Sequence, residues 1–130
     1  MQENQLFEYA IIRVVPRVER EEFLNVGVIL YCKDQKFLDM RYTIDEERLH
    51  NFCKDLDIQE LKDHLVAYEN ICKGNINGGP IAKLDLPSRF RWLTATRSTI
   101  VQSSKVHPGL CKTPAKTLEN LFERLVLVQS

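Results

Sequence analysis

The stretch Leu6–Val15 constrains the fold more than any other part of the chain, because it alternates in the manner of a strand and is apolar on both faces. One face carries Phe7, Tyr9, Ile11 and Val15, and the other carries Ala10, Ile12 and Val14. A strand of this kind is buried on both sides, so we expect it to be central and covered on both faces. Pro16 ends it, since proline has no N–H to donate to a neighbouring strand.

Two further strands are predicted at Asn25–Cys32 and Phe37–Tyr42. Only four polar residues, 33–36, separate them, and such a short connection is typical of an antiparallel hairpin. Gly27 interrupts the first of these strands, which indicates either a β-bulge or a close approach of two backbones.

Helices are predicted next, from their caps and their apolar spacing. Thr43 to Glu46 matches a capping box, and the apolar residues that follow have helical spacing: Leu49, Phe52, Cys53 and Leu56. Asp57 to Glu60 forms a second cap, for a helix that Gly74 is placed to end. Residues 75–80 are rich in Asn and Gly and are expected to form a loop.

The remaining third of the chain is less regular. Residues 84–95 are ambiguous, although Pro87 is suited to the first turn of a short helix. Residues 98–102 predict a strand and residues 103–111 a loop. Thr113 and Pro114 then open a C-terminal amphipathic helix with an apolar stripe of Leu118, Leu121, Phe122, Leu125 and Val126. The order of elements predicts a single α+β domain over residues 1–130, with an antiparallel sheet of three to four strands and helices packed on it.

Charge and cysteine content bear on the class of function. Eighteen basic residues balance eighteen acidic ones, which disfavours a general nucleic-acid-coating protein. No apolar run is long enough to cross a bilayer, and the polar N-terminus lacks a signal-peptide core. The four cysteines contain no Cys-x-x-Cys pair, so we expect reduced thiols in a cytoplasmic protein with no membrane partner.

The stretch 89–109 holds the only tryptophan and three arginines, and it supplies most of the candidate ligand- or partner-binding residues. With one arginine from the first strand, the candidates are Arg13, Arg89, Arg91, Trp92, Arg97, Ser98, Thr99 and His107. Arginine and tryptophan dominate protein interfaces, which favours a partner surface. The alternative interpretation places Trp92 and Phe90 in the core, with the arginines at its edge.

Arg13 requires a partner because it lies on an apolar strand. It is expected either to form a salt bridge with Glu22 or Asp45, or to lie beside Arg97 on a phosphate or carboxylate. Ser98 and Thr99 follow Arg97, where they either form an anion-binding turn or cap it with their hydroxyls.

His107 is followed by Pro108 and Gly109 and is interpreted mainly as a turn residue. A catalytic role would require a nucleophile such as Ser104 or Cys111. The spacings His50-x2-Cys53 and His107-x3-Cys111 resemble metal ligands, but burial of Cys53 explains its position better, and no metal or cofactor is expected.

Three blocks, residues 9–16, 22–32 and 89–102, resemble the bacterial domain-of-unknown-function family 3037. The resemblance implies a HipA-like kinase as a possible partner, because members are often encoded beside one. Where the family shows Ala-Pro-Arg-Ser, this chain has Ala95-Thr96-Arg97-Ser98, which makes a less rigid turn.

The leading hypothesis is therefore a small interaction or regulatory protein, with Ser98 or Thr99 as a phosphoacceptor. The alternatives are a binder of an anion, phosphate ligand or nucleic acid, with nucleic acid less favoured, and a hydrolase that uses His107. The sequence leaves homo-oligomers open.

Overall fold

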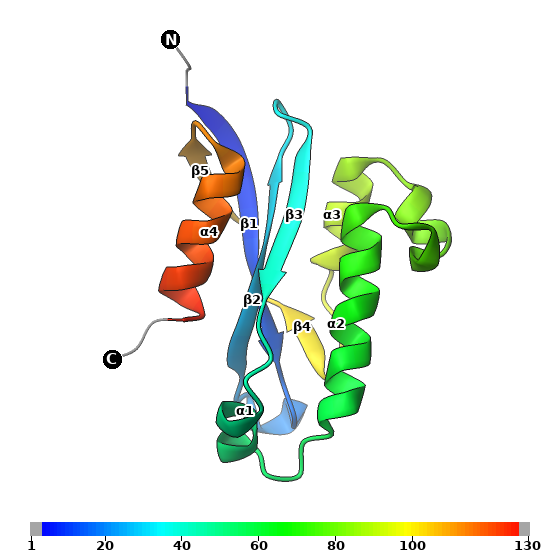
Figure 1. The fold of residues 1–130 in the computed structure, drawn as a ribbon, viewed down its shortest axis with the longest axis vertical. Coiled ribbons are helices and arrows are strands. Elements are labelled where there is room, and N and C mark those ends of the chain that lie inside the picture. The colour runs from blue at the N-terminus through cyan, green and yellow to red at the C-terminus, as the bar shows by residue number, and fades with distance from the viewer. Residues whose placement is uncertain (1–3, 128–130) are drawn as a thin grey trace.

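The computed structural model describes residues 4–127, which form a central sheet with helices on both faces (Figure 1). The five strands are β1 (Gln5–Val14), β2 (Leu24–Cys32), β3 (Phe37–Tyr42), β4 (Val101–Ser103) and β5 (His107–Cys111). The four α-helices are α1 (Glu46–Phe52), α2 (Ile58–Lys73), α3 (Leu86–Leu93) and α4 (Pro114–Leu125). Three short 3-10 turns are η1 (Val18–Arg20), η2 (Ile76–Gly78) and η3 (Pro80–Lys83). The predicted α+β class is confirmed, including the antiparallel sheet and the C-terminal helix.

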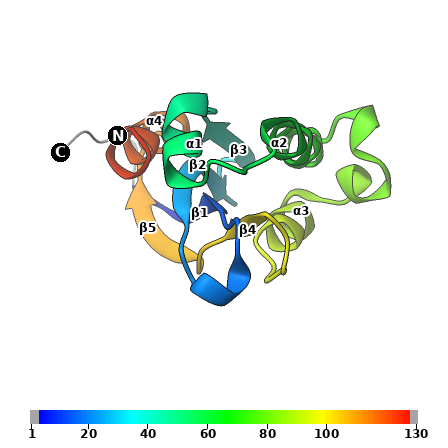
Figure 2. The same cartoon turned by 90° about the horizontal axis from the view of Figure 1, so that it is seen from below.

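Strand β1 is central, as its two apolar faces predict. It pairs with β2 along one edge, while β4 and β5 share its other edge. On the face covered by α2 and α3, Ala10, Ile12 and Val14 are at most 1% exposed. On the opposite face Phe7 joins a second apolar cluster with α4. The end-on view shows these helices on either side of the sheet (Figure 2).

Both structural roles considered for Gly27 are present. The register between β1 and β2 shifts after the Ile12–Gly27 pair: Arg13 pairs with Asn25, which leaves Val26 as the extra residue of a β-bulge next to Gly27. A Cβ atom on Gly27 would lie 2.7 Å from the carbonyl oxygen of Arg41, so β3 also approaches closely here.

The predicted helix caps are mostly found, with one correction. Asp57 caps α2, and Gly74 ends it with a φ of 69°. The first cap is Asp45 rather than Thr43, and its carboxylate accepts a hydrogen bond from the Arg48 N–H at 3.1 Å. The reason is that the Thr43 N–H donates to Val26 O at 2.9 Å, which keeps Thr43 in extended chain leaving β3.

The region after α2 differs most from the sequence prediction. Residues 75–83 contain the turns η2 and η3, and the ambiguous stretch forms α3, capped by Asp85. The predicted loop over residues 103–111 is wrong in part, because β5 forms there and extends the sheet to five strands. A local His-Pro-Gly sequence indicates a turn, but the open edge of β1 over residues 5–9 supplies the partner that makes it a strand. No helix among the described residues is long and apolar enough to cross a membrane.

Ser104 joins the two strands that share the edge of β1. It is a polar residue only 5% exposed, and its N–H donates to Ile11 O at 2.8 Å. Its hydroxyl accepts from the Ile11 N–H at 2.8 Å and donates to Lys105 O at 2.8 Å. Ser104 therefore satisfies the backbone of β1 at the point where β4 ends and before β5 begins.

We expect Ser104→Ala to lower the free energy of unfolding by about 1–3 kcal/mol, because the buried Ile11 N–H loses its acceptor. The matched control is Ser103→Ala, since the Ser103 hydroxyl donates only to the carbonyl of Ser104 at 2.8 Å. Urea denaturation measures both. Equal losses in the two variants would contradict the role assigned to Ser104.

Candidate functional site

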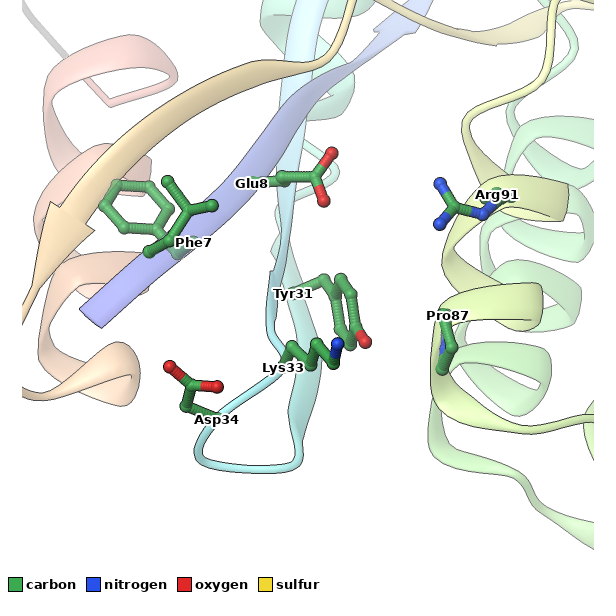
Figure 3. Close-up of a pocket in the computed structure, with 8 residues that line it drawn as sticks. Phe7, Glu8, Tyr31, Lys33, Asp34, Pro87 and Arg91 are labelled. Carbon is green, nitrogen blue, oxygen red and sulfur yellow. The ribbon is translucent and has the colours of Figure 1, made fainter.

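A pocket of about 290 Å³ opens between α3 and the ends of β1 and β2 (Figure 3). Its lining residues come from all three elements and the β2–β3 turn: Leu6, Phe7, Glu8, Tyr31, Lys33, Asp34, Pro87 and Arg91. Tyr31 forms the floor; it is 7% exposed, and its ring centroid lies 5.4 Å from that of Phe90. The pocket therefore has a buried aromatic base with charged side chains around it.

Charges of opposite sign face each other across this pocket. The Glu8 carboxylate on β1 and the Arg91 guanidinium on α3 point toward one another in Figure 3. Within residues 4–127 neither forms a salt bridge at 4.0 Å or less, and the same holds for Lys33 and Asp34. Burial raises the pKa of Tyr31 above its usual value, and the nearby charge of Arg91 opposes that shift. All four charged groups are thus available to an external ligand or partner.

Beside the pocket, part of the sheet has no helix over it. Leu6 and Leu110 form a cross-strand pair between β1 and β5, and they are 58% and 67% exposed. Helix α3 covers the same face of the sheet farther along and does not reach β5 (Figure 2). We call Leu6, Leu110, Glu8, Tyr31 and Arg91 the corner surface.

Arg97 and Trp92 contact each other, but in an internal cluster. The Arg97 guanidinium lies 4.0 Å from the Trp92 ring centroid and donates to the hydroxyl of Tyr68 at 3.3 Å. It also donates to the carbonyls of Trp92 and of Ala95, the latter at 3.4 Å. Trp92 is half-buried against the main core. Arg97 therefore fastens the connection after α3 onto α2 and α3.

The other two candidate arginines also have separate contacts. Arg89 donates to Ala82 O at 3.2 Å and packs against Gly74, where an added Cβ would lie 2.5 Å from its Nη1 atom. Arg13 lies over the ring of Phe23 at 3.9 Å. Neither salt bridge expected for Arg13 forms, because Glu22 pairs with Arg20 and Asp45 caps α1. The four arginines thus do not share one set of contacts.

The hydroxyl residues and the histidine occupy exposed positions. The Thr99 hydroxyl donates to Val101 O at 2.7 Å, as the capping interpretation expects, and Ser98 is exposed. The His107 ring is exposed and lies 5.3 Å from that of Tyr9. Both hydrogen-bonding roles of the Ser104 hydroxyl are used by the backbone.

Cys111 does not provide a nucleophile for His107. The two residues are four apart on β5, roughly 13 Å along the strand. Burial raises the pKa of the Cys111 thiol, which disfavours the reactive thiolate. Within residues 4–127 no group of three or more His, Cys, Asp or Glu side chains is placed to hold a metal ion.

Of the corner surface, the sequence pattern identified only Arg91 as a site residue. Leu6, Glu8 and Tyr31 belong to predicted strands, and Leu110 lay in a predicted loop. The available signal was the acidic residue at position 8 on a face that is otherwise apolar from Leu6 to Val14.

We expect Arg97→Gln to lower the free energy of unfolding by about 1–2 kcal/mol, through loss of the Trp92 contact and the charged hydrogen bonds. Arg91→Gln is the matched control and should change it by less than about 0.5 kcal/mol, because Arg91 is exposed and unpaired. Urea denaturation followed by Trp92 fluorescence measures both. A loss of unfolding free energy in Arg91→Gln as large as that in Arg97→Gln would contradict the stabilising role assigned to Arg97 alone.

Comparison with known families gives a match over most of the chain. Residues 9–126 match the family model described as "Protein of unknown function (DUF3037)". Comparisons with curated proteins and with solved structures gave no match. The matched residues include β1 from Tyr9 onward, the pocket floor at Tyr31, and α3, whereas Leu6 and Glu8 of the corner surface precede the match. The chain therefore belongs to the DUF3037 family of proteins of unknown function.

Proposed function

We propose that this protein is an interaction or regulatory module that binds a partner protein through its corner surface. The observation that supports this most is the exposed Leu6–Leu110 pair beside the unpaired charges of Glu8 and Arg91. A partner that covers this area removes two leucine side chains from water, worth roughly 1–2 kcal/mol for each. Arg91 and Tyr31 then supply the residue types that contribute most at interfaces.

A partner is expected to dock on the face of the sheet rather than extend its edge. β5 is an outer strand, but Pro108 has no N–H to donate to an added strand. Leu110, in contrast, projects its side chain from the uncovered face. The same proline disfavours homo-oligomers that form by pairing β5 of two chains.

The resemblance to the family makes a HipA-like kinase the first partner to test. Ser98 and Thr99 are exposed on the connection between α3 and β4. Their hydroxyls, the proposed phosphoacceptors, therefore follow directly in the chain on the helix at which we propose that the kinase docks. We propose a cytoplasmic setting, since the four cysteines are free thiols. Binding of one anion by all four arginines is less well supported, because Arg13, Arg89 and Arg97 have separate contacts and Arg91 lines the pocket of the corner surface.

Leu110→Asp and Arg91→Glu should each weaken binding to a HipA-like kinase of the source organism by roughly 30-fold, the effect of an interface hot spot of about 2 kcal/mol. Isothermal titration calorimetry with purified proteins measures the affinities. Val66→Asp is the control, because Val66 is 49% exposed on α2, away from the corner surface.

Two results would count against the proposal in different ways. Absence of binding by the unmodified chain would exclude the kinase as partner. Binding that is unchanged by Leu110→Asp and Arg91→Glu, or weakened equally by Val66→Asp, would place the interface elsewhere.

A further inference from the structure

Arg13 is a fixed and unpaired cation at the other end of β1 from the corner surface. Its guanidinium carbon is 3.9 Å from the centroid of the Phe23 ring. Its Nε atom is buried and has no hydrogen-bond partner within residues 4–127. A buried N–H without an acceptor is destabilising. The Nε of Arg89 is in the same state, but Arg89 donates to Ala82 O, whereas the Arg13 side chain forms no hydrogen bond or salt bridge within the described part of the chain.

The acids around Arg13 do not act as its counter-ions. Glu21 and Glu22 line the same cavity, but the Glu22 carboxylate is bound by Arg20. Among the described residues no carboxylate oxygen lies within 4.0 Å of an Arg13 nitrogen. Arg13 is half-buried on β1, so it is a partly desolvated charge without a partner.

The cavity beside Arg13 combines this cation with apolar walls. Its volume is about 310 Å³, at the small end for ligand sites. Val15, Val18 and Phe23 line it, and Val18 and Phe23 are 49% and 45% exposed. A ligand with an apolar part would bury these side chains while its anion meets the guanidinium.

We propose that this cavity binds a carboxylate carried on a short apolar group, with Arg13 holding the carboxylate. Glu21 and Glu22, which also line the cavity, favour a singly charged carboxylate over phosphate, because their repulsion grows with the charge of the ligand. Such a group is either a small organic acid or the C-terminal carboxylate of another protein chain. This site is independent of the corner surface, so either proposal can fail alone.

The test is a titration of the full chain followed by ¹H–¹⁵N NMR at constant ionic strength. The probes are isobutyrate for a free acid, N-acetylvaline for a chain terminus, and inorganic phosphate. We expect saturable shifts of the Phe23 and Gln102 amides with at least one carboxylate, and binding of phosphate weaker by roughly tenfold. Tighter binding of isobutyrate indicates a small acid, and tighter binding of N-acetylvaline indicates a chain terminus.

Variants separate the Arg13 site from general charge effects. Arg13→Gln should weaken the binding roughly tenfold or more, through loss of charged hydrogen bonds. Arg17→Gln makes the same charge change without touching this cavity and should leave binding intact. Phe23→Ala removes an apolar wall at an exposed position and should weaken binding even if Arg13→Gln does not fold.

Several outcomes would overturn the proposal. These are phosphate binding as tight as carboxylate binding, unchanged binding by Arg13→Gln, or no saturation with either carboxylate below roughly 100 mM. A shift of the Arg13 Nε resonance caused by Glu22→Gln without any probe would also overturn it, since Arg13 would then have an internal counter-ion.

Discussion

The structure depends on a single strand that must be buried on both faces and hydrogen-bonded on both edges. β1 meets these demands with α4 on one face, α2 and α3 on the other, β2 along one edge, and β4 with β5 along the other. No single later segment pairs with its full length. The second edge is therefore divided between two short strands. Ser104 lies between these strands in the chain and forms hydrogen bonds with Ile11 of β1 there.

The candidate interface exists because the helices do not cover the whole face of the sheet. Helix α3 packs over Tyr31 through Phe90 but does not reach β5, so Leu6 and Leu110 remain exposed on a sheet whose other apolar side chains are mostly buried. Glu8 replaces an apolar residue on the same face and lies at the boundary, opposite Arg91. The fold thus places an apolar pair and two unpaired charges together at one end of its central strand.

Elements that depend on neighbouring residues were predicted correctly from the sequence. The predictions were wrong where contacts with residues distant in the sequence determine the structure. Alternation identified β1, and Asp57 and Gly74 bounded α2, because capping needs only neighbouring residues. β5 was missed because His107 to Gly109 resembles a turn until the free edge of β1 is known. Thr43 was wrongly predicted to be a helix N-cap, because its N–H donates to Val26 O on the neighbouring strand β2. Among the site residues, the contacts of Arg97 with Trp92 and Tyr68 were not predicted, because they depend on how the segment after α3 folds back onto α3 and α2.

Backbone hydrogen exchange of the chain, free and bound to a HipA-like kinase, tests the central claim most directly. Slower exchange on binding is predicted over residues 86–91 and 107–111, with no change on the exposed side of α2. Both segments border the corner surface although they lie far apart in the sequence. Protection confined to α2 or α4, or spread evenly over the chain, would contradict the account.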